Sequence, residues 1–178
     1  MTKDDLLGMF RTGINNCKLV YASMLLFSHE DIPEFYLKWS AALGSEIPRP
    51  FEDKEIAALL YDKTVSKIGF GALYDTVHRS ALKELFEVTN NYCQQTNQLA
   101  LLKSQSWYQF WRIIRNCFSH DFKFQFNVYD RTKLPVSWNG ITIDSSFDGK
   151  SLTHGHISRE QFLEFLDDVA EFINNELA

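Results

Sequence analysis

A short segment in the C-terminal half of the chain holds side chains that could act together on a phosphate. Arg115, Asn116, Ser119 and His120 place a cation, an amide, a hydroxyl and an imidazole within six residues. An imidazole can take up and release a proton near neutral pH, and a guanidinium stays ionised and can bind phosphate in a fork. Such groups suit proton transfer and the stabilisation of charge that develops on a phosphate.

The element that must position these groups is an amphipathic helix ending near His120. At about 100° per residue, the apolar side chains form one core-facing stripe within about 60° of Trp107. This stripe consists of Phe110, Trp111, Ile114 and Phe118. Arg115 lies at its edge and Asn116 points the opposite way. Residues five apart differ by about 140°, so Arg115 and His120 do not converge on one helix. They could meet if the helix ends by Ser119 and His120 turns back, or if a second subunit supplies the other half.

A purely structural interpretation of the same residues stays open. Arg115 and His120 near a helix C-terminus would interact favourably with the helix dipole. An arginine at the border of an apolar face can also extend its guanidinium to water.

Three other sequence patterns are weaker candidates for a functional site. His154-Gly-His156 could bind zinc with Asp144, Asp148 or His120, but a solvent-facing turn is favoured, and we expect no metal and no cofactor. Adjacent residues cannot form a hydrolase triad, which excludes that interpretation of Ser119-His120-Asp121. Gly69-Phe-Gly71 lacks the following Lys-Ser/Thr of a phosphate loop and is expected to be a hinge-like break.

Composition favours one globular domain of 178 residues, because 45% of the residues are hydrophobic and 15% are aromatic. No apolar run approaches the roughly 20 residues of a membrane span. The start, Met-Thr-Lys-Asp-Asp, lacks an apolar signal core, so we expect a cytoplasmic protein without a membrane partner. Cys17, Cys93 and Cys117 are odd in number and widely spaced, which predicts reduced thiols.

The charge is unevenly distributed. The chain carries −5 overall, yet residues 101–133 hold six Lys/Arg and two acids, a local +4. This segment suits one focused phosphate contact, although an ordinary fluctuation in charge explains it equally well. Weaker candidates for substrate binding are Arg112 and Lys123 in this segment, Ser119, and Tyr108 on an expected exposed flank near Arg115.

Periodicity and end signals predict a mainly α fold, a helical bundle of about five to six helices with a small β-hairpin insertion before the C-terminal helix. Helices are expected over residues 4–28, 33–43, 51–67 and 72–98, then from Leu99 or Ser104 to the end of the focal segment, and from Ser158 onward. Gly44 should stop the second helix, and residues 47–50 should form an extended linker. Thr2-x-x-Asp5 and Ser158-x-x-Gln161 are expected caps.

The remaining signals predict β-structure between His120 and the last helix. Alternation over residues 122–128 predicts a strand, and Asn139-Gly140 predicts a hairpin over residues 135–143. Asp148-Gly149 predicts a second turn. The expected organisation is a single domain over residues 1–178, with N-terminal helices over 1–50 and a β insertion over 122–157.

The motif Arg115-Asn116-x-x-x-His120 at the end of a helix resembles the R-x4-6-H motif of the HEPN superfamily, in which a polar residue often follows the arginine. The resemblance covers roughly residue 51 to the end. It implies a metal-independent endoribonuclease with Arg115 and His120 as the catalytic pair and Asn116 as polar support. It further implies an RNA substrate and a homodimer with a composite active site. A toxin–antitoxin or phage-defence role would follow, with an antitoxin or nucleotidyltransferase as partner. The 37 residues between His120 and Ser158 are more than the bare fold needs.

Two alternatives belong to other functional classes. The first is a non-catalytic HEPN-like module that binds a nucleotide or a partner, such as a nucleotidyltransferase. Members without activity usually lack the arginine or the histidine, and this chain keeps both. The second is an unrelated helical interaction protein.

Overall fold

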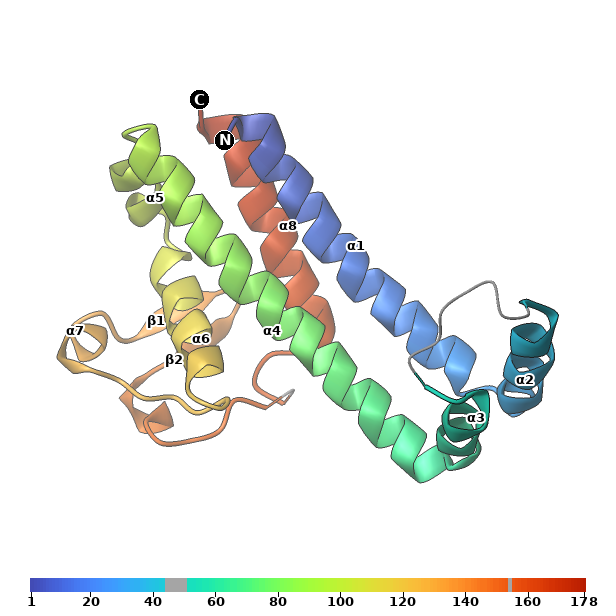
Figure 1. Cartoon of the computed structure of the whole chain (residues 1–178). Coiled ribbons are helices and arrows are strands. Elements are labelled where there is room, and N and C mark those ends of the chain that lie inside the picture. The colour runs from blue at the N-terminus through green and yellow to red at the C-terminus, as the bar shows by residue number, and fades with distance from the viewer. Residues whose placement is uncertain (44–50, 154) are drawn as a thin grey trace. The chain divides into compact units, whose positions relative to one another are not determined.

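The computed structural model describes residues 1–43, 51–153 and 155–178. The expected stop at Gly44, the expected linker over 47–50 and His154 lie outside the described residues. Within those ranges the chain is mainly helical, with eight α-helices and one two-stranded antiparallel hairpin before the last helix (Figure 1). The predicted fold class is therefore confirmed.

The chain divides into two compact units. One comprises residues 15–77, and the other comprises residues 1–14 together with 78–178. Helices α1 (Lys3–Phe27) and α4 (Lys63–Gln95) each contribute residues to both units. The single domain expected over residues 1–178 stays a prediction.

The unit of residues 15–77 is built around a helical pair. Helix α2 (Ile32–Leu43) packs against α3 (Asp53–Tyr61), and Figure 1 shows the two side by side. The Tyr36 hydroxyl donates a hydrogen bond to Asp53 Oδ1 at 3.3 Å across this contact. Pro33 and Ser40 of α2 are buried, so one face of α2 is used within the unit.

The break predicted at Gly69-Phe-Gly71 is wrong. Helix α4 runs through both glycines, and the chain breaks instead at Asp62, between α3 and α4. The Asp62 carboxylate accepts hydrogen bonds from the backbone N–H groups of Thr64 and Val65, both at 3.0 Å. These bonds satisfy the first donors of α4, whereas a glycine inside a helix costs only about 1 kcal/mol and can be tolerated. The helix boundary therefore lies at the capping residue Asp62 and not at the two glycines.

The other unit places the focal helix in its core. Helices α5 (Leu99–Ser104), α6 (Tyr108–Ser119) and α8 (Arg159–Glu176) belong to it. Both predicted caps are confirmed, since Thr2 and Asp5 bond reciprocally and Ser158 and Gln161 do the same. Among the described helices, none has both the length and the apolar character that crossing a bilayer requires.

The three cysteines are confirmed as free thiols, and all three are buried. Burial raises the pKa of Cys17 and Cys93 to about 11 each, and that of Cys117 to about 12.

The segment after α6 contains the predicted hairpin but not the predicted strand. Strands β1 (Val136–Trp138) and β2 (Ile141–Ile143) pair around Asn139 and Gly140, whose φ angles of 44° and 77° are those the turn requires. The turn at Asp148-Gly149 is also confirmed, with Gly149 at φ 77°.

Over residues 122–128 only Lys123 makes a β-bridge, to Ser151. Phe124 and Phe126 are buried while Gln125 and Asn127 are exposed. The alternating pattern therefore corresponds to a buried and an exposed side of an extended segment, not to a strand paired in a sheet. Asn127 instead caps the short helix α7 (Val128–Arg131), which ends the extended segment.

Candidate functional site

Helix α6 is anchored by the apolar face that its sequence predicts. Its central residue, Trp111, is fully buried, and the indole Nε1 donates a hydrogen bond to the Leu82 carbonyl of α4 at 3.1 Å. The Trp111 ring also meets Phe86 and Phe165 edge to face, with centroids 5.1 and 5.6 Å apart. Aromatic pairs of this geometry contribute about 0.5–1.5 kcal/mol each beyond the area they bury. These contacts fix the rotation of α6 and hence the direction of its polar residues.

Arg115 is held toward α4. Its guanidinium forms an ion pair with Glu87, lies over the Phe86 ring at 5.8 Å from the centroid, and donates from Nη1 to Asn116 Oδ1 at 3.0 Å. The Arg115 side chain is 28% exposed and that of Glu87 is 50% exposed. An ion pair this accessible to water contributes about 0–1 kcal/mol, so another anion could compete for the guanidinium.

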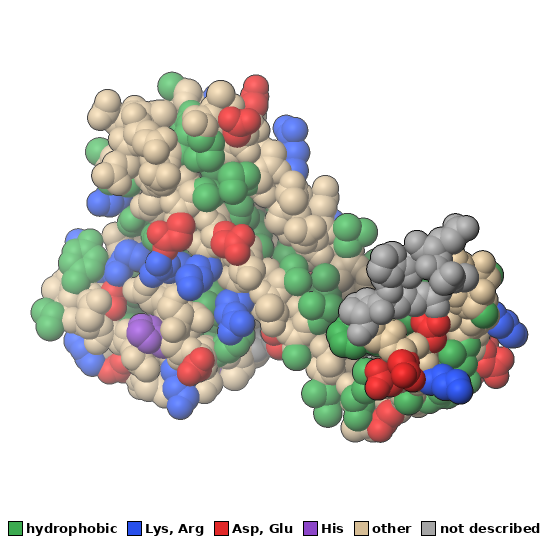
Figure 2. Space-filling model, viewed as in Figure 1, with side chains coloured by type: hydrophobic (Ala, Val, Ile, Leu, Met, Phe, Trp, Pro, Cys, Tyr) green, Lys and Arg blue, Asp and Glu red, His purple; other side chains and the backbone are tan. Residues whose placement is uncertain are grey.

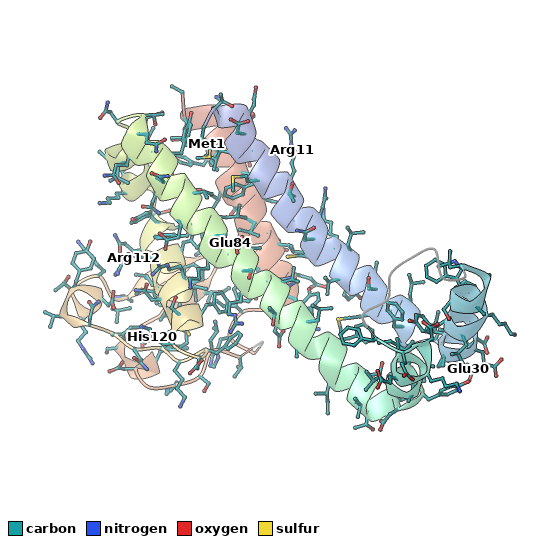
Figure 3. All side chains as sticks on the ribbon, viewed as in Figure 1. Met1, Arg11, Glu30, Glu84, Arg112 and His120 are labelled. Atoms are coloured by element: carbon teal, nitrogen blue, oxygen red, sulfur yellow. The ribbon has the colours of Figure 1, made fainter. Side chains whose placement is uncertain are left out.

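His120 terminates α6 and faces solvent. Its backbone N–H donates to the Cys117 carbonyl at 3.0 Å, which closes the last turn. Within the described ranges its imidazole makes no hydrogen bond or ion pair, and it lines an open cleft of about 660 Å³ together with Asn116. Figure 3 labels His120 at this end of α6. Figure 2 shows several Lys and Arg side chains gathered on one face of this unit.

A sharp turn after His120 builds the cleft. Asp121 and Phe122 both have left-handed backbones, with φ of 52° and 60°; an aspartate adopts this conformation readily, whereas it costs free energy for a bulky residue such as Phe122. Phe122 is held in place by an edge-to-face contact with Phe118 and by the guanidinium of Arg79, 5.5 Å above its ring. The turn sends the chain back alongside the end of α6.

The reversed chain pairs with the segment that precedes the last helix. The Phe124 N–H donates to the Lys150 carbonyl at 2.9 Å, and the Gly149 N–H donates to the Phe124 carbonyl at 2.8 Å. The Phe126 N–H donates to Asp148 Oδ1 at 3.0 Å. This pairing forms the wall opposite α6, which also carries Gln125 and Asn127.

Both carboxylates that line the cleft are paired with arginines. Asp130 is buried and forms an ion pair with Arg112, whose side chain is 15% exposed. Asp148 pairs with Arg131. The Phe126 N–H and then the Arg131 guanidinium lower the pKa of Asp148 below its usual range. These ion pairs neutralise the two acids, which would otherwise repel a phosphate.

The weaker candidates lie in different surroundings. The expected exposed flank for Tyr108 is wrong: Tyr108 is buried, its hydroxyl donates to Asn90 Oδ1 at 2.9 Å, and its ring stacks on Phe86. Burial raises its pKa. Arg112 is engaged by Asp130, whereas Ser119 and Lys123 are exposed beside the end of α6. Ser119 Oγ donates to the Arg115 carbonyl at 3.3 Å.

The structure brings Asn116 and His120 to one cleft and leaves Arg115 outside it. Arg115 does not line the cleft, and no interaction among the described residues joins it to His120. A single chain therefore offers an imidazole and an amide in one place and a guanidinium on a neighbouring face of α6. Chemistry that needs all three would require Arg115 to leave Glu87, or a second copy to supply its own arginine.

Besides Phe124 and Phe126, which belong to the alternating apolar segment, the cleft is lined by four residues that the sequence did not indicate as site residues: Gln125, Asn127, Asp130 and Gly149. One signal was available. Asn127-x-x-Asp130 is a capping box, in which each side chain bonds the other's backbone N–H, at 2.8 and 2.9 Å. That pattern predicts a helix start and so argues against a continuous strand. The described residues contain no group of three or more His, Cys, Asp or Glu side chains placed to hold a metal ion.

No family model, curated protein or solved structure matches this chain. Functional inference therefore rests on the site itself.

Proposed function

We propose that the protein is a metal-independent endoribonuclease of HEPN type that cleaves RNA by attack of a 2′-hydroxyl on the adjacent phosphate. The observation that carries the proposal is the exposed His120 imidazole, which has no bonding partner among the described residues and lines an open cleft beside Asn116. Because no described side chain holds this imidazole, it can take up or release a proton in the cleft without first breaking an ion pair or a hydrogen bond.

In this mechanism His120 takes the proton of the 2′-hydroxyl as the oxygen attacks phosphorus. The bond to the 5′-oxygen breaks, and that oxygen leaves with a proton from a second acid. The products are a 2′,3′-cyclic phosphate and a 5′-hydroxyl. Asn116 would orient a phosphate oxygen or the imidazole, and Arg115 would hold the phosphorane charge. Among the described residues one chain supplies one histidine to the cleft, so a homodimer with a composite active site would provide both the base and the acid.

The test compares RNA cleavage by the wild type and by His120→Ala, both in EDTA, with end-group analysis of the products. His29→Ala, which removes an exposed histidine from the other unit, is the matched control. We expect the wild type and the control to leave 2′,3′-cyclic phosphate and His120→Ala to lose at least about 100-fold in rate, as removal of a general acid–base group does. Equal cleavage by all three proteins would refute the assignment of His120.

A second candidate function follows from the position of Arg115. Its ion pair with Glu87 keeps the guanidinium outside the cleft, which favours a HEPN-like module that does not cleave RNA. Such a module would bind a nucleotide or a protein partner, such as a nucleotidyltransferase, without cleaving RNA. Saturable nucleotide binding that His120→Ala weakens, without cleavage of any RNA, would favour this module over the enzyme. The toxin–antitoxin or phage-defence setting belongs to the enzyme proposal and depends on the same test.

A further inference from the structure

The unit of residues 15–77 exposes more large apolar side chains than it buries. Of the seventeen exposed large hydrophobic residues in the described chain, twelve fall in this unit, whereas its buried apolar residues are Cys17, Ala57, Leu60 and Tyr74. Single exposed apolar residues are ordinary on a monomer, but such a concentration marks an interaction surface. Figure 2 shows apolar side chains across the visible face of this unit.

Two of these side chains, Phe35 and Trp39, form an apolar seam on α2. Phe35 is 61% exposed and Trp39 is 53% exposed, and a spacing of four residues places them about 40° apart on one helix face. The buried residues of α2, Pro33 and Ser40, are instead on the side that is used within the unit. Helix α2 is therefore two-sided, with one face packed and the other apolar and open.

A charged pair flanks this seam. Glu34 and Lys38 precede Phe35 and Trp39 by one residue each and so lie along one side of them. Their side chains are 68% and 81% exposed, and the Lys38 Nζ to Glu34 Oε2 distance is 3.9 Å. A contact this long and this exposed is weak and leaves both charges available to other partners.

We propose that this seam binds the same seam of a second copy, with the two α2 helices antiparallel across a two-fold axis. In that arrangement Phe35 of each copy meets the other copy's Trp39, and Glu34 meets the other copy's Lys38. A two-fold interface must be self-complementary in this way: if one residue contacts a second residue of the other copy, that second residue contacts the first in return. A partner of uniform charge would instead meet a like charge at one end of the flank. The inference concerns a different unit from the cleft and does not depend on the proposed activity.

The exposed apolar area suits the centre of a dimer interface. Phe35 and Trp39 are 61% and 53% exposed, and since an aromatic side chain buries about 150–250 Å² when covered, they offer on the order of 200 Å² per copy. A standard interface buries about 800 Å² per partner, and somewhat more than half of that is apolar. Leu59 and Tyr61 are also exposed, but they lie on opposite sides of α3, so only one of them can extend the seam. The seam thus supplies roughly half of the apolar area of one side of a standard interface.

The test is the solution mass of the full chain, measured by sedimentation over a dilution series. We expect a dimer for the wild type, and a dissociation constant raised at least about 100-fold by Phe35→Glu with Trp39→Glu, since aromatic residues at the centre of an interface dominate its affinity. Val128→Glu, at a side chain 82% exposed in the other unit, is the matched control and should remain dimeric. Far-UV circular dichroism should be unchanged in all variants because the substituted side chains are exposed.

A charge swap tests the antiparallel arrangement separately. Glu34→Lys alone and Lys38→Glu alone should each weaken the dimer, because each puts like charges opposite one another. The double swap should restore it. A monomeric wild type would assign the seam to a different protein and overturn the proposal. A dimer that survives Phe35→Glu with Trp39→Glu would place the interface elsewhere, and a double swap as weak as the single ones would refute the antiparallel pairing.

Discussion

Replacing Asp130 with Asn should destabilise the protein strongly, because it leaves a buried guanidinium without its counter-ion. The Asp130 side chain is 2% exposed and that of Arg112 is 15% exposed. Breaking a buried ion pair by removing one partner costs about 3–5 kcal/mol. Arg112 would keep its hydrogen bond to Gln109 at 2.9 Å and its position over the Tyr129 ring at 4.8 Å, so we expect the lower end of that range.

A loss of about 3 kcal/mol corresponds to a fall of roughly 6–12 °C in Tm for a chain of this length. The assay is thermal and urea unfolding followed by circular dichroism. Glu87→Gln is the matched control, since it removes the acid of the more exposed Arg115 pair and should cost only about 0–1 kcal/mol. If Asp130→Asn were as mild as this control, the Arg112 guanidinium would have to reach water, and the burial of the Arg112–Asp130 pair would be refuted.

A double variant separates the ion pair from the rest of the site. Arg112→Met with Asp130→Asn removes both charges and keeps a long apolar side chain in place. Replacing a whole buried pair in this way is often close to neutral. We therefore expect the double variant to be more stable than Asp130→Asn alone. A double variant that is less stable than the single one would show that Arg112 stabilises the protein through contacts other than the pair.

Two other predictions test the helix break and the acid response. Gly69→Ala and Gly71→Ala should each raise the free energy of unfolding by about 0.5–1 kcal/mol, measured by urea unfolding. Both glycines lie inside α4, and no atom lies within 4 Å of an added Cβ. A destabilised variant would mean that the chain bends at the glycines. Asp148 has a pKa below its usual range when folded, so its contribution to stability is present above about pH 4 and is lost as the pH falls through the folded value. Asp148→Asn should therefore be less stable than the wild type at neutral pH, and the difference should shrink in acid; a gap that is constant with pH would contradict this.

Interactions between residues close together in the chain account for most of the helices, caps and turns. The apolar stripe of α6, the two reciprocal caps and the Asn139-Gly140 turn each depend on residues within a few positions of one another, and all are confirmed. The predicted break at Gly69-Phe-Gly71 failed because two local signals competed and the cap at Asp62 prevailed. The predicted strand failed because alternation registers which side chains are buried but not whether a partner strand exists.

The direction of the functional groups depended on contacts between residues far apart in the chain. The sequence predicted that Arg115 and His120 would diverge on one helix, and this part of the geometry follows from the helix period alone. That Arg115 pairs with Glu87, 28 residues earlier, could not be read from either segment, because it depends on how α4 and α6 pack. The burial of Tyr108 has the same origin, since its ring stacks on Phe86 of α4.

The sequence by itself thus determined most of the helices, the caps at Thr2 and Ser158, the hairpin and the residue types available for chemistry, since these depend on short-range geometry. Only the tertiary structure decided that His120 and Asn116 share a cleft and that Arg112 forms a buried ion pair with Asp130, which lines that cleft. It also decided that one face of α2 remains apolar and exposed. Each of those outcomes depends on which residues distant in the sequence cover a given surface. Helical or strand periodicity shows which face of an element is apolar, but not which other element packs against it.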